Sequence, residues 1–133
     1  MASFASIPAE RTKTGKEHRV PLSPPAVAIL EEMLEVKVSD YVFPSKVEDR
    51  PLSNMALLQL LKRMSYPDIT VHGFRSTFRD WVSEVSAHSD SLGEMALAHT
   101  VGNKVEAAYR RGDSLDKRRL LMADWAKFCT YES

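Results

Sequence analysis

Residues 71–85 place the strongest constraint on the fold, because their apolar side chains recur at the spacing of an α-helix. The apolar face that this spacing predicts consists of Phe74, Phe78, Trp81, Val82 and Val85. A face this broad is typical of a helix that packs against a core. We therefore expect a buried helix here, with the rest of the chain arranged around it.

The first turns of this predicted helix carry His72 and Arg75, which lie three residues apart. Side chains at this spacing project from one side of a helix toward one point. An arginine suits a phosphate at that point, because its planar guanidinium matches phosphate oxygens and stays charged. An isolated pair of this kind also occurs by chance on solvated helix ends, so the pair alone decides nothing.

A β-hairpin is predicted ahead of the helices. Residues 6–8 and 18–22 read as two short strands around a polar connection, and Gly15 gives the backbone freedom that a hairpin tip requires. Lys13 then lies on or beside an exposed turn. By itself it would be an ordinary turn lysine.

Two further helices are predicted before residue 65. Ser23 is expected to cap a helix that begins at Pro24, and Ser53 or Asn54 to cap a leucine-rich helix that runs to about Met64. The apolar stripe of the first comprises Ala26, Val27, Ile29, Leu30, Met33 and Leu34. Stripes of this width indicate that both helices belong to the core.

The last third of the chain holds three helix-start patterns. Residues 91–94 have the Ser-x-x-Glu form of a capping box and predict a short helix that carries His99. Residues 103–106 offer a second capping box, and the helix behind it carries Tyr109. Acidic residues at 113 and 116 open an amphipathic helix over about 115–129, which packs on its own domain or on a neighbouring protomer.

Length and composition fit one domain or a large part of one. The 133 residues are 44% hydrophobic and carry 18 Lys and Arg against 18 Asp and Glu. This balance argues neither for nor against nucleic acid, but basic residues gather in two stretches, 11–19 and 104–119. Cys129 is the only cysteine, and no stretch reads as a signal peptide or a membrane span. We therefore expect a cytoplasmic protein with no membrane partner.

Lys13, the pair His72 and Arg75, His99 and Tyr109 follow one another in an order that describes a phosphodiester site without a metal. Each has a plain structural explanation when taken alone. The set is carried by three blocks, RTKTGKEHRVPLS (11–23), HGFRSTFRDW (72–81) and LAHTVGNKVEAAYRR (97–111). With these blocks the chain resembles the tyrosine recombinases of the phage integrase family, especially the integrases of genomic islands and satellite prophages. The likeness covers nearly the whole chain from about residue 7.

That resemblance implies a fold that is mainly α with a small β-hairpin or sheet, as in a truncated tyrosine recombinase catalytic domain. Residues 1–133 would be the C-terminal part of that domain, with the hairpin at about 6–22 and a helical remainder. Family members carry another catalytic arginine on a helix before the hairpin. That helix and the separate core-binding domain have no counterpart here, so the resemblance implies a fragment that recombines little or no DNA alone.

The resemblance also implies roles for the site residues. Tyr109 would attack a DNA phosphate and form a 3′-phosphotyrosyl bond, while Arg75 would hold the non-bridging oxygens. His72 and His99 would assist through hydrogen bonds and proton transfer, and Lys13 would protonate the leaving 5′-oxygen. Phosphate contacts with double-stranded DNA are expected from further basic residues, namely Arg11, Lys16, Arg79, Lys104, Arg110 and Arg111. No cofactor is expected, because the phosphotyrosyl bond keeps the energy of the broken DNA bond.

Alternatives remain open at this point. A type IB topoisomerase-like domain shares the tyrosine chemistry, although the block spacing fits integrases better. A non-catalytic DNA-binding or regulatory remnant of an integrase would account for the absent arginine. A metalloenzyme is disfavoured, because His72 and His99 have no neighbouring carboxylates or thiols at ligand spacing. We also expect self-association, through the helix at 115–129 or through apolar surface left by the missing upstream part.

Overall fold

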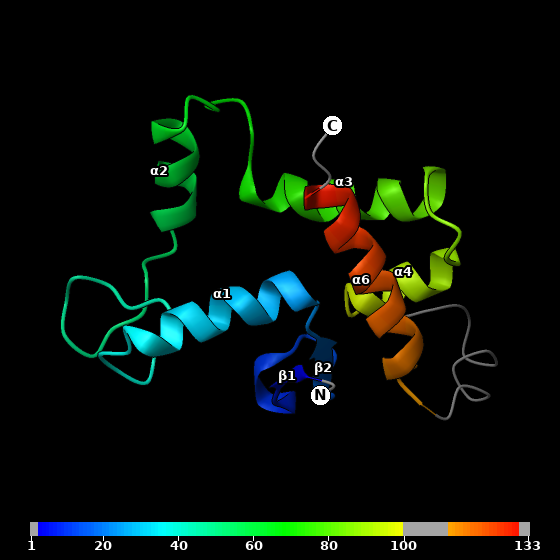
Figure 1. The fold of residues 1–133 in the computed structure, drawn as a ribbon, viewed down its shortest axis with the longest axis horizontal. Helices are drawn as coiled ribbons and strands as arrows, with labels where there is room; N and C mark the ends of the chain where they lie inside the picture. Colours follow the sequence, from blue (N-terminus) through cyan, green and yellow to red (C-terminus); the bar gives the residue numbers. More distant parts are fainter. Residues whose placement is uncertain (1–2, 100–111, 131–133) are drawn as a thin grey trace. The chain divides into compact units, whose positions relative to one another are not determined.

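The computed structural model describes residues 3–99 and 112–130, and its elements carry the labels of Figure 1. In chain order they are β1 (Phe4–Ile7), the 3-10 helix η1 (Ala9–Arg11), β2 (His18–Pro21), α1 (Pro24–Glu35), α2 (Ala56–Arg63), α3 (Val71–Glu84), α4 (Asp90–Ala96) and α6 (Leu115–Thr130). The predicted class, mainly helical with a small sheet, is confirmed.

The chain divides into two compact units, and each is described by itself. One consists of Met1–Pro24 together with Thr77–Ser133, and we call it the discontinuous unit. The other consists of Pro25–Ser76, and we call it the central unit. The boundary falls inside α3, so the first turns of this helix belong to the central unit and the rest to the discontinuous unit.

The N-terminal hairpin pairs β1 and β2 in antiparallel fashion, with Phe4 opposite Pro21 and Ile7 opposite His18. The first strand begins and ends earlier than predicted, because Pro8 precedes η1 instead of closing the strand. Gly15 has a φ of +70°, a left-handed conformation that glycine adopts without steric cost. Its predicted role in the hairpin connection is confirmed.

The core of the discontinuous unit forms where the later turns of α3 meet α4 and α6 (Figure 1). Its buried side chains are Phe78, Trp81, Val82, Leu92 and Leu121. The three that come from α3 follow the predicted helical spacing, so the organising helix is confirmed over this part. Phe74 and Val85 remain 54% and 64% exposed, so the buried face is shorter than predicted.

An aromatic cluster that includes both tryptophans of the chain joins α3 to α6. The ring centroids of Trp81 and Trp125 lie 5.1 Å apart, and Phe78 meets Trp125 edge to face at 5.3 Å. Phe128 stacks on Trp125 at 5.7 Å. Pairs of this kind add about 0.5–1.5 kcal/mol each beyond the area that they bury. The last helix thus packs on its own unit, which is one of the two arrangements predicted for it.

The close approach of α4 to α3 depends on Gly93. A Cβ at this position would lie 3.0 Å from Val82 Cγ1, closer than ordinary van der Waals contact. Val82 is fully buried, and a close-packed interior gives it little room to move. The absence of a side chain at residue 93 therefore sets the spacing of these two helices.

The observed helix starts differ from the predicted capping patterns. Ser89, not Ser91, caps α4, because its Oγ accepts a hydrogen bond from the Leu92 backbone N–H at 3.2 Å. In α2 the N-cap residue is Met55, which makes no side-chain capping bond, so neither serine nor asparagine at 53–54 caps this helix. Both helices exist where the periodicity predicts them, but the capping residues were misassigned.

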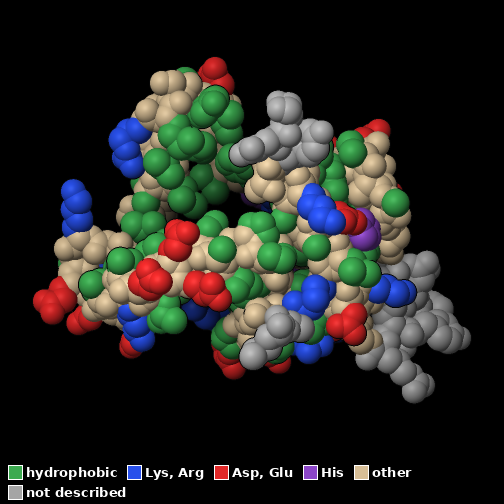
Figure 2. All heavy atoms as spheres, viewed as in Figure 1, with side chains coloured by type: hydrophobic (Ala, Val, Ile, Leu, Met, Phe, Trp, Pro, Cys, Tyr) green, Lys and Arg blue, Asp and Glu red, His purple; other side chains and the backbone are tan. Residues whose placement is uncertain are grey.

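The central unit buries less apolar surface than its sequence pattern predicts. No residue of α1 is buried, and Leu34 is 68% exposed. In α2 only Leu61 is buried, while Leu57 and Leu60 are exposed. Figure 2 shows hydrophobic side chains over α2 and acidic side chains along α1. The interpretation of these segments as core helices is wrong for α1 and for all of α2 except Leu61, because an apolar side is buried only where another element covers it.

Over residues 3–99 and 112–130, no helix combines the length and the apolar character that crossing a bilayer requires.

Candidate functional site

Lys13 lies exposed in the turn between η1 and β2, as predicted. The side chain of Thr12 holds this turn, because its Oγ1 donates to the carbonyl oxygens of Ala9 at 3.1 Å and Lys16 at 2.8 Å. Arg11 and Lys16 are exposed on the same connection. Three exposed cations, at the end of η1 and on the turn after it, form a surface that suits a phosphate backbone.

His72 and Arg75 lie in the first turns of α3, within the central unit. The helix start is held by Thr70, whose Oγ1 accepts a hydrogen bond from the Gly73 backbone N–H at 3.0 Å. His72 is exposed and Arg75 is partly buried. The predicted placement of both residues at one end of the helix is confirmed, while their placement relative to Lys13 and His99 stays a prediction.

His99 lies beyond the end of α4, so the prediction that this short helix carries it is wrong, and it contacts Glu94 twice. Its Nδ1 lies 2.6 Å from Glu94 Oε2, and its backbone N–H donates to the Glu94 carbonyl oxygen at 2.9 Å. Ala98, just before it, has a φ of +58°, and this left-handed residue turns the chain out of the helix. The local backbone and one carboxylate together fix the histidine against the end of α4.

Glu94 in turn pairs with Arg79 of α3. Arg79 donates through Nε to Glu94 Oε1 and through Nη1 to Ser83 Oγ at 2.6 Å, and it lies 3.3 Å from Asp90 Oδ1. The Arg79 hydrogen bond holds the pKa of Glu94 below its ordinary value, and the contact with His99 acts in the same direction against the effect of burial. The predicted DNA contact of Arg79 stays untested, and these carboxylates compete with a phosphate for its guanidinium.

A second polar cluster joins the hairpin to the start of α6. Arg19 donates from Nε and Nη2 to the two carboxylate oxygens of Asp113, each at 2.7 Å, which is the bidentate geometry of a strong ion pair. This pairing lowers the pKa of Asp113. Arg118 is 1% exposed and donates to the carbonyl oxygens of Asp113 at 2.7 Å and Arg19 at 2.6 Å. Arg118, within the basic stretch 104–119, therefore ties the hairpin to α6 and is too buried to contact a DNA phosphate.

Tyr109 and the predicted phosphate contacts Lys104, Arg110 and Arg111 lie outside the described residues. The described residues on either side are held by the two clusters just described, at His99 and at Asp113. Sequence reasoning missed both clusters. The sequence signal for the first is a carboxylate five residues before His99, which the capping-box interpretation had already assigned to another role.

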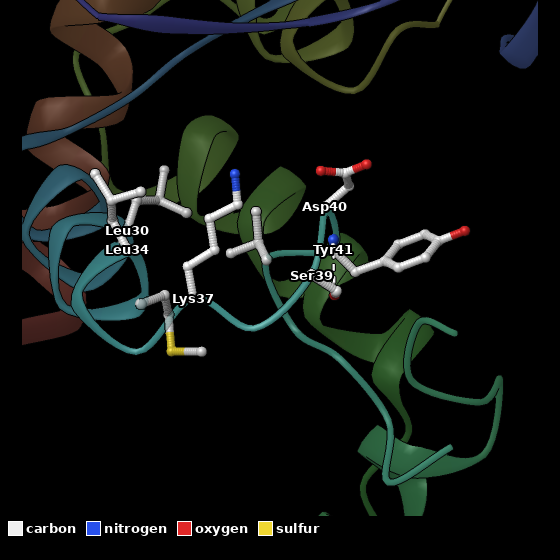
Figure 3. A pocket seen from close by; sticks show the side chains of 8 residues that line it. Leu30, Leu34, Lys37, Ser39, Asp40 and Tyr41 are labelled. Atoms are coloured by element: carbon white, nitrogen blue, oxygen red, sulfur yellow. Dashed lines mark hydrogen bonds between the residues drawn. The ribbon is translucent and has the colours of Figure 1, made fainter. Parts of the chain in front are cut away.

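An open pocket of about 290 Å³ lies at the end of α1 in the central unit (Figure 3). Its lining is mostly apolar and consists of Leu30, Met33, Leu34, Lys37, Ser39, Asp40, Tyr41 and Val42. None of the predicted site residues lines it, and we assign it no chemistry. Across the part of the chain that the structure describes, no group of three His, Cys, Asp or Glu side chains is arranged to hold a metal ion.

Comparison with known protein families gives a match to the phage integrase family over residues 2–114. The chain belongs to the phage integrase family. This confirms the resemblance based on the three sequence blocks, and the match spans all five predicted catalytic residues.

Curated relatives of this integrase-family chain carry names that agree with the match. It is 38% identical to prophage integrase IntA of Escherichia coli K12 over 94% of this chain and 31% of the relative. It is 37% identical to prophage integrase IntZ of the same organism, over 91% of this chain and 30% of the relative. The integrase of Shigella phage Sf6 is 32% identical, over 91% and 32%. The chain thus spans about a third of the length of these relatives, and no solved structure matches it.

Proposed function

We propose that this chain contributes the tyrosine nucleophile and the catalytic side chains around it to an integrase active site, which breaks and rejoins DNA at specific sites. The observation that carries the proposal is that the family match spans all five candidate catalytic residues, in the order of the family pattern. These residues are Lys13, His72, Arg75, His99 and Tyr109. Support also comes from the exposed position of Lys13 on the hairpin turn and from the contact of His99 with Glu94.

The proposed reaction is a transesterification. The phenolic oxygen of Tyr109 attacks a DNA phosphorus, the bond between that phosphorus and the 5′-oxygen breaks, and a 3′-phosphotyrosyl bond forms. A phenol with the ordinary pKa of about 10 is a weak nucleophile at neutral pH, so His99 or His72 accepts its proton. Arg75 stabilises the charge that gathers on the non-bridging oxygens, and Lys13 donates a proton to the departing 5′-oxygen.

We propose further that residues 1–133 lack one phosphate clamp of the complete site. The family pattern includes an arginine on a helix before the hairpin, and Arg11 and Arg19 lie within the hairpin segment instead. Loss of one such donor typically costs about 3–4 kcal/mol of transition-state stabilisation. We therefore expect slow strand cleavage and little complete recombination by residues 1–133 alone.

The test is covalent capture on a nicked duplex from which the short fragment that carries the released 5′-hydroxyl diffuses away after cleavage. We expect a slow protein–DNA adduct that survives denaturation and is absent in Tyr109→Phe. Tyr66→Phe is the matched control, because it removes an exposed phenol from the central unit and should leave the adduct unchanged. DNA binding without any adduct over long incubation would contradict the proposal and favour a non-catalytic remnant.

A second measurement tests the predicted phosphate contacts. Binding to duplex DNA should weaken steeply from low to physiological salt, because each phosphate contact releases counterions. Lys16→Ala should reduce the salt slope by about one contact, whereas Lys37→Ala, an exposed lysine of the central unit, should leave it unchanged. A salt-independent affinity would contradict electrostatic contact with the backbone.

A further inference from the structure

We propose that Glu94 is a positioning residue that fixes the tautomer of His99, so that Nδ1 carries the ring proton and Nε2 is the nitrogen that acts at the scissile phosphate. The catalytic role of His99 in this inference rests on the proposed function. The arrangement itself rests on the contacts of His99, Glu94 and Arg79 within the discontinuous unit.

The contact between the two side chains determines where the proton lies. Glu94 Oε2 and His99 Nδ1 are 2.6 Å apart, a distance typical of a charge-assisted hydrogen bond. An ionised carboxylate has no proton to donate, so the proton of this bond belongs to Nδ1. In the neutral ring Nε2 is then an acceptor, which is the form that takes a proton from a tyrosine hydroxyl.

The Glu94 carboxylate is itself fixed by hydrogen bonds. Its two oxygens have separate partners, since Oε1 accepts from Arg79 Nε and Oε2 faces His99 Nδ1. Arg79 is fixed in its turn by Ser83 and Asp90. The Glu94 and Arg79 side chains are 26% and 28% exposed, so solvent screens this pair less than an ion pair at the open surface.

The tautomer of His99 should respond directly to a substitution at residue 94. In Glu94→Gln the side chain has one acceptor and one donor group. Arg79 offers only donors, so it takes the amide oxygen and the amide NH₂ turns toward His99. Nδ1 must then accept, and the ring proton moves to Nε2. The substitution keeps the size of the side chain and moves the ring proton of His99 to the other nitrogen. Loss of the ion pair alone would not move this proton.

The first test is the tautomer itself, measured by long-range ¹H–¹⁵N correlation on the DNA-free chain with the His99 ring assigned by its loss in His99→Gln. We expect the neutral ring to be protonated at Nδ1 in the unmodified chain and at Nε2 in Glu94→Gln. Glu84→Gln, an exposed glutamate at the end of α3, is the matched control and should leave the His99 signals unchanged. A ring protonated mainly at Nε2 in the unmodified chain, or a tautomer unaffected by Glu94→Gln, overturns the proposal.

The second test is a double-mutant cycle on the rate of covalent adduct formation. At saturating DNA, Glu94→Gln should slow the adduct about 10–100-fold, the range found when the outer partner of a metal-binding histidine is removed. In a His99→Ala background it should cause no further loss, because its effect passes through that ring. An equal loss in both backgrounds overturns the positioning role. Absence of any Tyr109-dependent adduct overturns the proposed function instead, and the tautomer measurement still decides the orientation of His99.

Discussion

The two units of this chain use similar apolar patterns and reach different degrees of burial. In the discontinuous unit, Trp81 of α3 packs against Trp125 of α6 in an aromatic cluster. In the central unit, α1 repeats apolar side chains at helical spacing, yet none of its residues is buried. Periodicity shows which side of a helix is apolar, whereas burial depends on whether another element covers that side.

The largest expected effect contrasts one side chain from each unit. Trp81→Ala should lower the free energy of unfolding by about 3–5 kcal/mol, because it removes the centre of the aromatic cluster. Leu34→Ala should change it by less than about 0.5 kcal/mol, because this leucine is mostly exposed. Urea denaturation followed by circular dichroism measures both. Similar costs for the two variants would show that the central unit packs as tightly as the discontinuous one.

A somewhat smaller effect is expected from the buried guanidinium of the discontinuous unit. Arg118→Met should lower the free energy of unfolding by about 2–3 kcal/mol, because it leaves the carbonyl oxygens of Arg19 and Asp113 without their charged donor. Lys117→Met, at the exposed neighbouring position, is the control and should cost less than about 0.5 kcal/mol. Thermal unfolding monitored by tryptophan fluorescence follows this unit selectively, since both tryptophans lie in it. Equal stability of the two variants would count against Arg118 as a structural tie.

The two units also differ in the hydrogen bonds at the starts of their helices α4 and α2. Ser89→Ala should cost about 1 kcal/mol, because its hydroxyl caps α4 in the discontinuous unit. Ser53→Ala, the position expected from sequence to cap α2, should cost almost nothing, because that helix begins after Met55 without a side-chain cap. Denaturation midpoints of the two variants decide the matter. A larger loss at Ser53 would restore the original assignment for α2.

The smallest effect concerns acid stability. Arg19 holds the pKa of Asp113 below the ordinary aspartate value of 3.8, so the ion pair contributes stability above about pH 4 that is lost as the pH falls through the lowered pKa. Between about pH 5 and pH 2, Asp113→Asn should therefore lose less stability than the unmodified chain, by at most about 1 kcal/mol after solvent screening. Asp68→Asn in the central unit should behave like the unmodified chain. Parallel pH profiles for all three proteins would refute a stabilising role for the Arg19–Asp113 pair.

Much of the secondary structure could be predicted from the sequence, because the helices and the hairpin depend on local signals. The spacing of Phe78, Trp81 and Val82 and the turn at Gly15 are local, and both predictions are confirmed. The burial of α1 was mispredicted, because it depends on neighbours that the sequence of one segment does not specify. The capping residue of α4 was mispredicted because several polar residues precede this helix and Ser89, not Ser91, accepts the hydrogen bond from the Leu92 backbone N–H.

The candidate site divides in the same way. The exposed turn of Lys13 and the shared helix end of His72 and Arg75 were predictable from local pattern and from family resemblance. The partners that hold the site were not predictable. Arg79 and Glu94 are 15 residues apart, and Arg19 and Asp113 are 94 apart, so only the folded chain brings each pair together.

The pairing of Arg19 with Asp113 has a consequence for how the protein is made. Translation releases the hairpin before α6, so Arg19 meets its ion-pair partner only after the entire central unit has emerged. Until then Trp125 of α6 does not cover the apolar side of α3. Apolar surface of this kind on a nascent chain is prone to aggregation and is the kind of surface that chaperones protect. The discontinuous unit can therefore be completed only after the central unit has been synthesised.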